Sequence, residues 1–247
     1  MYVKPVACDE KPGKISDMFK ALFKNDQAMT VVVSIILVYT SLNICGNLVL
    51  YFFRFDVGNE GAYSIFAAVA FAAQVLVMMV IPLLRKRFSK SQLFISGFII
   101  QIAGFAVILI MAFAKLYTPQ SWYILCLPGI LIYLGYGMLN VIMTIFLSDS
   151  VDYGEVMNGT REESVIFSMQ TFTVKLASGV AVFLAGLVVD WIHLDTAAAV
   201  QTQDTLDDLR MWMTIPSVIL LIVGIFVFKR FYKLDDTRME EIKSKLN

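Results

Sequence analysis

A single charged side chain, Lys175, lies near the middle of an otherwise apolar segment and calls for a chemical explanation. The segment from Val165 to Val189 is long enough to cross a bilayer. An ammonium group at mid-bilayer costs about 3 kcal/mol on insertion scales. Lys175 is also too far from either end of the segment to reach the interface. We therefore expect it to face a protein interior or an aqueous cavity and to have a partner.

Polar side chains that can form hydrogen bonds recur at helical spacing in three apolar segments. Asn43 and Asn47 are one turn apart, as are Asn140 and Thr144, and Thr171 lies one turn before Lys175 with Gln170 beside it. A bundle with a partly polar interior indicates a pathway or a binding site rather than a simple anchor. For Asn43 and Asn47, hydrogen bonds to neighbouring helices, which contribute roughly 0.6 kcal/mol each, are an equally good explanation.

A cluster of charged residues immediately precedes the segment of Lys175. Its members are Asp149, Asp152, Glu155, Arg161, Glu162 and Glu163. Their density and mixed sign favour an interacting network in a polar loop at residues 148–163, and a merely solvated surface is the alternative. A basic run in another connection, made of Arg85, Lys86, Arg87 and Lys90, is interpreted first as an orientation signal.

None of the 20 acidic residues offers Lys175 an obvious counter-charge. All of them are expected in the first 27 residues, the connections or the tail, except Asp190 at the boundary of a span. Lys175 could be deprotonated by desolvation, held by water and neutral polar groups, or paired with a carboxylate on another polypeptide. The third explanation is the most economical if the chain is half of a larger bundle. Lys175 should then face an open surface of the isolated chain.

The composition identifies a membrane protein. Of its 247 residues, 58% are hydrophobic and 16% are charged, against about 45–50% and about 25% in soluble domains. The net charge of zero gives no indication of nucleic acid as a partner. The three cysteines have no metal or disulfide spacing, and no nucleophile–base pair, metal cluster or phosphate-binding loop is recognisable. We expect neither an enzyme nor a cofactor or metal site in this chain.

Six apolar stretches are each long enough for a transmembrane helix. They run approximately from Ala28 to Phe53, Gly61 to Leu84, Gln92 to Ala114, Trp122 to Leu147, Val165 to Val189 and Met211 to Phe231. The predicted fold is an all-α integral membrane bundle over residues 28–232. An aqueous segment, residues 1–27, precedes it and holds a short amphipathic helix at residues 16–23. A polar tail, residues 233–247, follows it.

The distribution of basic residues predicts the orientation of the bundle. Sixteen Lys and Arg residues fall on the side of the two termini and three on the opposite side, with Lys175 inside a span. Cytoplasmic loops carry the excess of basic residues in membrane proteins. Both termini are therefore predicted to be cytoplasmic, and an even number of spans gives the same result.

An ordered run of residues from Asp149 to Lys175 resembles that of one transporter family. It reads Asp149-Ser-Val-Asp-Tyr-Gly-Glu155, Arg161-Glu-Glu-Ser164 and Gln170-Thr-Phe-Thr-Val-Lys175. The pattern is similar to that of the melibiose-carrier group, the glycoside–pentoside–hexuronide:cation symporters of the major facilitator superfamily. The resemblance covers the whole chain, which corresponds to the central loop and the C-terminal six helices of a twelve-helix transporter.

The resemblance implies cation-coupled sugar transport by alternating access. In such symporters the sugar and the coupling cation, Na+ or H+, bind between two six-helix halves. The acids that hold the cation lie on the N-terminal half, and Lys175 resembles the lysine that reaches toward them. Asn140 stands where the melibiose carrier has a sugar-stacking tryptophan, which implies a different glycoside or a uronide. The candidate substrate-binding residues are Asn43, Asn47, Asn140, Gln170, Thr171 and Lys175.

The same resemblance implies a cytoplasmic gate. The residues that match its charge network are Asp149, Asp152, Glu155, Arg161 and Glu163. In the family such a network pairs with basic residues of neighbouring loops and closes the inner side. Arg85, Lys86 and Arg87 are the candidates for that pairing in this chain. Exposed ion pairs contribute under about 1 kcal/mol each, which suits a gate that must reopen.

Two hypotheses remain for the chain by itself. In the first, it is a half-transporter that works with an N-terminal six-helix half or with another copy of itself. In the second, it is a truncated or split-gene fragment that acts at most as a membrane interaction protein. Both predict a multi-pass protein of the cell membrane in contact with the lipid bilayer.

Overall fold

The computed structural model describes residues 23–159, 161 and 163–246, and this part of the chain is helical. Its helices are α2 (Asp26–Tyr51), the π-helical turn η1 (Phe52–Asp56), α3 (Ala62–Leu84), α4 (Lys90–Phe113), the 3-10 turn η2 (Trp122–Leu125), α5 (Cys126–Asn158), α6 (Glu163–Trp191), α7 (Gln203–Phe231) and α8 (Asp236–Leu246). Six are long and apolar enough to cross a membrane, which confirms the predicted six-span, all-α fold. The amphipathic helix predicted at residues 16–23 lies, except for Phe23, outside the described residues.

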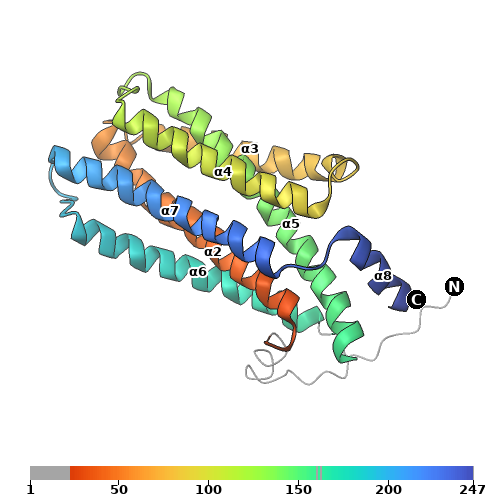
Figure 1. Cartoon of the computed structure of the whole chain (residues 1–247). Coiled ribbons are helices and arrows are strands. Elements are labelled where there is room, and N and C mark those ends of the chain that lie inside the picture. The colour runs from red at the N-terminus through yellow and green to blue at the C-terminus, as the bar shows by residue number, and fades with distance from the viewer. Residues whose placement is uncertain (1–22, 160, 162, 247) are drawn as a thin grey trace.

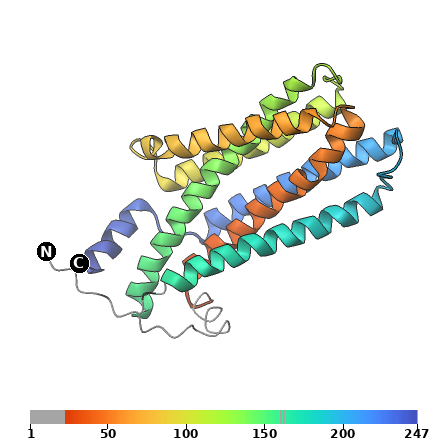
Figure 2. The same ribbon diagram turned by 180° about the vertical axis from the view of Figure 1, so that it is seen from behind.

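The six long helices form two groups of three that pack against each other (Figures 1 and 2). Helices α3 and α4 both pack along α5, whereas α6 and α7 both pack along α2. Contacts of α4 with α7 and of α2 with α5 join the two groups. Because α2 contacts both α5 and α6, the polar pairs that the sequence places on these three helices come into one region.

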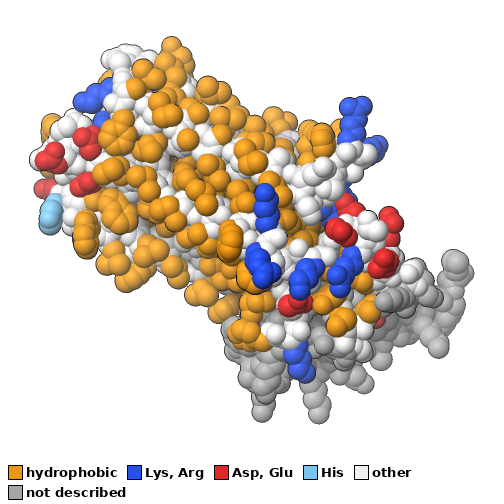
Figure 3. Space-filling view, in the orientation of Figure 1, with side chains coloured by type: hydrophobic (Ala, Val, Ile, Leu, Met, Phe, Trp, Pro, Cys, Tyr) orange, Lys and Arg blue, Asp and Glu red, His pale blue; other side chains and the backbone are white. Residues whose placement is uncertain are grey.

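The surface has the distribution of side chains that a bilayer requires. Hydrophobic side chains cover the middle of the face seen in Figure 3, and charged side chains gather at its two ends. Large apolar residues of α3, α6 and α7 are exposed, among them Phe71, Phe183 and Phe226. Such extensive apolar surface is compatible with lipid rather than with water. The chain is a multi-pass membrane protein.

The fourth span is longer than predicted, and the loop predicted at residues 148–163 is mostly helix. Helix α5 continues to Asn158, so that only residues 159–162 separate it from α6. The prediction was wrong because hydropathy marks where a helix leaves the membrane and not where the helix ends. The extension of α5 is stabilised from the side, since Tyr153 and Val156 pack against the segment that contains α8.

The tail also contains a helix. Helix α8 lies against the extension of α5 (Figure 1), and Leu234, Met239 and Ile242 are buried in a small apolar cluster between them. We call the end of the bundle that carries α8 the inner end, in line with the orientation predicted from the basic residues. The opposite end, which carries η1, is the outer end.

Helices α4 and α5 approach each other closely at a glycine. A Cβ atom on Gly135 would lie 2.5 Å from the carbonyl oxygen of Gly97 and 2.6 Å from the backbone nitrogen of Gln101. Small residues allow membrane helices to come this close. Buried alanines serve the same purpose on α6, which runs along α2, at Ala177, Ala181 and Ala185.

Candidate functional site

Lys175 lies on an exposed face of α6, as expected for the isolated chain. It forms no ion pair or hydrogen bond with any residue that the structure describes. Two of the acids expected in polar connections, Asp56 and Asp149, instead lie on continuations of the membrane-candidate helices, and their side chains are buried. Asp56 lies at the outer end and Asp149 at the inner end. These two acids pair with Arg210 and Lys90. Neither of them is the counter-charge of Lys175.

The polar residues of α2, α5 and α6 meet beside this exposed face. The amide of Asn140 donates a 2.6 Å hydrogen bond to the hydroxyl of Tyr39, whose ring packs edge-on against Tyr136 with centroids 5.5 Å apart. The amide nitrogen of Gln170 lies 3.5 Å from the hydroxyl oxygen of Thr144 and so joins α6 to α5. Amides, hydroxyls and aromatic rings from three helices thus lie close together.

Asn43 and Asn47 continue this polar region along α2. Both are half-buried, and each donates a 2.7 Å hydrogen bond to the backbone carbonyl one turn earlier, that of Tyr39 or Asn43. The alternative explanation, hydrogen bonds to a neighbouring helix, is not realised with any described residue. Each amide keeps one N–H and its carbonyl oxygen for another partner.

This region can bind a hydroxylated molecule. Thr171 is exposed and donates a 3.3 Å hydrogen bond to the carbonyl of Phe167, which leaves its hydroxyl oxygen as an acceptor. Lys175 adds a cation one turn further along α6. Neutral donors and acceptors with aromatic rings and one charge are typical of sites for polar small molecules. Within the described residues, no three His, Cys, Asp or Glu side chains come together as metal ligands would.

A buried ion pair connects three helices at the inner end. Lys90 of α4 and Asp149 of α5 are in contact, and their side chains are only 6% and 8% exposed. Asp236 of α8 lies 3.5 Å from Lys90 and 3.2 Å from Arg85. Burial by itself would raise the pKa of Asp236, but the hydrogen bond from Arg85 and the charges of both bases lower that pKa below its ordinary value. Asp149 therefore lies in a helix junction, apart from the other acids of its cluster.

None of the three basic residues expected to pair with the acidic cluster does so with a described residue. Arg85 pairs with Asp236 of α8. Arg87 and Lys86 are exposed, and neither forms an ion pair with a residue in the described part of the chain. The prediction that Arg87 pairs with the acidic cluster is therefore wrong for the described residues. The first turn of α4 brings Lys90, and not Arg87, into contact with Asp149.

Arg161 holds three other acids of the cluster together. Its guanidinium nitrogens lie 3.0 Å from Asp152, 2.8 Å from Glu155 and 3.3 Å from Glu163, so that it links the end of α5 to the start of α6. The hydrogen bond to Glu155, followed by those to the other two acids, raises the pKa of Arg161. The Arg161 side chain is 48% exposed, and such pairs contribute under about 1 kcal/mol each. Glu162 lies outside the described residues.

A second buried junction, at the outer end, was missed by the sequence analysis. The carboxylate of Asp56 accepts hydrogen bonds from Arg210 at 2.5 and 2.8 Å and from the hydroxyl of Tyr117 at 2.6 Å. The Arg210 and Asp56 side chains are 3% and 4% exposed. Asp56 ends the π-helical turn η1, a rare conformation that is frequent at functional positions. No local pattern marks these residues, because the three belong to distant segments.

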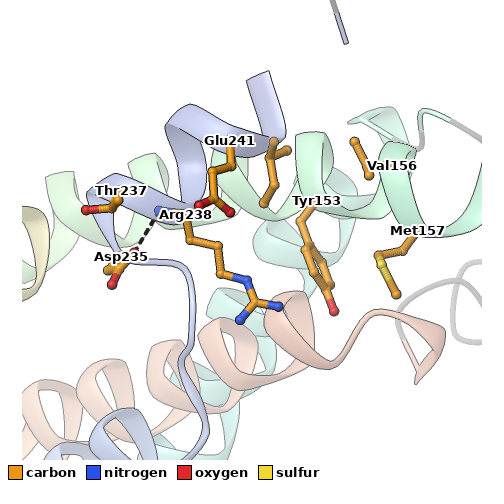
Figure 4. A pocket seen from close by; sticks show the side chains of 8 residues that line it. Tyr153, Val156, Met157, Asp235, Thr237, Arg238 and Glu241 are labelled. Carbon is orange, nitrogen blue, oxygen red and sulfur yellow. Dashed lines mark hydrogen bonds between the residues drawn. The ribbon is translucent and has the colours of Figure 1, made fainter. Parts of the chain in front are cut away.

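A cleft at the inner end lies between α8 and the extension of α5 (Figure 4). It encloses about 360 Å³. Figure 4 shows Arg238 of α8 extending toward Tyr153 of α5, with Val156 and Met157 beside it. The backbone nitrogen of Arg238 donates a 2.8 Å hydrogen bond to Asp235, which caps the first turn of α8. Acidic and basic side chains both line this cleft, so it has no single charge preference.

Comparisons with known proteins agree on one kind of function. The family described as MFS/sugar transport protein matches residues 4–236. The uncharacterized symporter YjmB of Bacillus subtilis is 25% identical over 94% of this chain and 49% of its own length. The raffinose carrier protein of Pediococcus pentosaceus is 23% identical over 94% of this chain and 35% of its own length. The chain thus spans half or less of these two relatives.

A shorter relative is similar over more of its own length. An uncharacterized 29.9 kDa protein of Pseudescherichia vulneris is 27% identical over 78% of this chain and 68% of that protein. The chain described here has a mass of 27.7 kDa. The two polypeptides are thus of comparable size.

Proposed function

The chain belongs to the family of MFS/sugar transport proteins, and we propose that it supplies the C-terminal six-helix half of a cation-coupled sugar symporter in the cell membrane. Relatives named as a raffinose carrier and as a symporter support this proposal. The chain spans only part of their length, so transport is proposed for an assembly of this chain with a second six-helix unit. Lipid, a sugar and a coupling cation are its other partners.

The exposed position of Lys175 is the observation that carries the proposal. An ammonium in the middle of a membrane helix is stable only with a partner or water, and none of the described residues pairs with it. A second bundle placed against the α2, α5 and α6 face would bury Lys175 and could supply a carboxylate. The N-terminal half of a symporter is such a bundle.

The sugar site is proposed on the same face. Its residues are the candidates predicted from the sequence, Asn43, Asn47, Asn140, Gln170, Thr171 and Lys175, to which the geometry adds Tyr39 and Thr144. Their amide and hydroxyl groups match the hydrogen-bonding needs of a glycoside. Lys175 would also favour a uronide, because a carboxylate on the sugar would pair with the ammonium.

The coupling cation, Na+ or H+, is proposed to bind mainly to acids of the second half. Two buried acids among the described residues, Asp56 and Asp149, already have basic partners. Arg161 and its three acids are proposed as the cytoplasmic gate, since this cluster is exposed and lies where two helices meet. Asp149, which lies in a buried junction, is proposed to support the gate by holding α5 in place.

Uptake measurements test this proposal. A panel of glycosides and uronides is supplied to cells that express the chain alone or together with an N-terminal six-helix half from a relative. The panel is measured with and without Na+ and at two values of pH. We expect uptake only with both halves, and we expect Lys175→Met to abolish it. Lys229→Met, which changes an exposed lysine at the end of a span, is the matched control and should transport normally.

The possible outcomes separate the two hypotheses for the chain. Accumulation of sugar against a gradient by the chain alone, with no second bundle, would overturn the half-transporter proposal. If both halves insert correctly and no sugar is taken up by the chain alone or by the two halves together, only the second hypothesis remains, in which the chain acts as a membrane interaction protein. Normal uptake by Lys175→Met would show that Lys175 is not part of the sugar site.

A further inference from the structure

A second polar groove lies closer to the outer end, between α2 and α6. It encloses about 350 Å³, within the range of roughly 300–1,000 Å³ that is usual for small-molecule sites. Asn47 and Tyr51 of α2 form one wall, and Gly186 and Asp190 of α6 form the other. An added Cβ on Gly186 would meet no atom within 4 Å. The absence of a side chain there leaves the groove open.

The groove continues the face that carries Lys175. On α6, Val182 and Gly186 both line it. Val182 follows Lys175 by seven residues and Gly186 follows Val182 by four, which keeps all three on one side of the helix. At 1.5 Å per residue the groove lies roughly 16 Å from Lys175 along α6. On α2, polar residues at every fourth position connect the two regions, at Tyr39, Asn43, Asn47 and Tyr51.

The groove has hydrogen-bonding groups that the fold leaves free. The carboxylate of Asp190 is exposed and forms no ion pair or side-chain hydrogen bond with the described residues. Asn47 uses one N–H within α2 and keeps the rest of its amide. The ring of Tyr51 stacks with that of Phe55 at a centroid distance of 6.5 Å. A carboxylate and an amide beside an aromatic ring can hold the hydroxyls and the apolar face of a sugar.

The polar lining is confined to this groove, because a second groove on another side of α6 is apolar. Leu184, Leu187 and Trp191 of α6, together with Trp212 and Pro216 of α7, line a cavity of about 230 Å³. Its lining is almost entirely apolar and suits an acyl chain of the bilayer. Two grooves at similar depth on one helix thus differ in chemistry.

We infer that the groove of Asn47, Tyr51, Gly186 and Asp190 is a second sugar-binding subsite, on the outer side of the site around Lys175. The class of ligand rests on the proposed function, whereas the position and the binding groups rest on the groove itself. The carboxylate of Asp190 accepts hydrogen bonds from two neighbouring hydroxyls of the sugar, and the amide of Asn47 binds a third. The subsite holds the sugar before it moves along the polar residues of α2.

Protection of a cysteine from labelling tests the inference in the full chain. Gly186→Cys is made in a background in which Cys8, Cys45 and Cys126 are alanine, and a membrane-impermeant thiol reagent is added outside intact cells. Raffinose, melibiose and lactose are the probes, with mannitol as the osmotic control. We expect at least one sugar to slow the labelling. Val182→Cys serves as a second reporter if Gly186→Cys does not insert.

Three variants decide where the protecting sugar binds. Asp190→Asn should raise the sugar concentration for half-protection about tenfold or more, because hydrogen bonds to a carboxylate are lost. Gln170→Ala, which weakens the site around Lys175, should leave that concentration unchanged. Leu187→Cys, in the apolar groove, should show no protection by sugar.

Two results would overturn the inference. One is labelling that none of the three sugars slows, and the other is protection that disappears in Gln170→Ala, which would mean that the sugar acts from the inner site. Labelling and uptake are both measured in cells that express this chain together with an N-terminal six-helix half from a relative, which keeps the two proposals apart. Protection without uptake would contradict the transport proposal alone, whereas uptake without protection would contradict the subsite alone.

Discussion

Lys90 and Asp149 form a buried ion pair although 59 positions separate them in the chain. The pair joins the first turn of α4 to α5, and Asp236 of α8 lies close enough to contribute to it. It is thus the point where the inner ends of three helices are fixed to one another. The residues around it make specific predictions possible.

Removal of the base should be more damaging than removal of the acid. Lys90→Met leaves Asp149 buried without a partner among the described residues and should cost about 3–5 kcal/mol of stability. Asp149→Asn should cost less, because Lys90 retains Asp236 at 3.5 Å. The midpoint of thermal unfolding in detergent measures the loss of stability in both variants. Lys86→Met, which changes an exposed lysine, is the control. Equal losses for the two variants would contradict the role given to Asp236.

The outer junction should behave as a second fixed point. Arg210→Met leaves the buried carboxylate of Asp56 with Tyr117 as its only described hydrogen-bond donor, and should also cost about 3–5 kcal/mol. Arg54→Met is the control, because Arg54 and Glu60 form an exposed pair at 3.7 Å that contributes under about 1 kcal/mol. Thermal unfolding compares the two variants. A similar small effect in both would show that the buried pair is dispensable.

A methyl group at Gly135 should disrupt the packing of α4 on α5. The Cβ of Gly135→Ala would meet backbone atoms at 2.5 and 2.6 Å, which cannot move aside as a side chain would. Overpacking of this kind costs roughly 1–3 kcal/mol. Gly179→Ala, whose Cβ meets nothing within 4 Å, should leave stability unchanged or slightly raised. Unfolding midpoints of the purified variants distinguish these outcomes, and equal midpoints would refute the close approach.

Docking of α8 should depend on acid pH through Asp236. The pKa of Asp236 is lowered in the folded chain, so its contribution is present at neutral pH and is lost as the pH falls through that lowered value, below 3.8. The side chain is 39% exposed, which limits the contribution to under about 1 kcal/mol. Protection of the α8 amides from hydrogen exchange, taken relative to the intrinsic exchange rate at each pH, should fall at acid pH. Asp236→Asn should show this loss of protection already at neutral pH, whereas Glu240→Gln, at an exposed position, should resemble the original chain.

The cluster around Arg161 should control access from the inner side. Arg161→Gln removes all three of its ion pairs at once, and we expect it to favour the inward-open state of the assembled transporter. Asp152→Asn, which removes one pair, should have a smaller effect in the same direction. Labelling of an engineered cysteine from the cytoplasmic side measures the change. Arg87→Gln is the control, and unchanged accessibility in Arg161→Gln would exclude a gating role.

The sequence by itself determined the elements that depend on local properties. Hydropathy and length are properties of short stretches, so the six spans from Ala28 to Phe231 could be located before their packing was known. The exposed position of Lys175 also followed from local reasoning, because a search for a counter-charge needs only the positions of the acidic residues. The polar pairs of α2, α5 and α6 could be found, but their contacts could not.

Only the tertiary structure decided which charges are paired and where α5 ends. Asp56 and Arg210 are 154 positions apart, and each looks like an ordinary residue at the end of an apolar stretch. Asp149 and Asp152 are three residues apart on one helix, yet the first is buried against Lys90 and the second binds exposed Arg161. Burial and ion pairing depend on which helices lie beside a residue. That arrangement is set by the packing of the whole bundle and not by any single stretch of the chain.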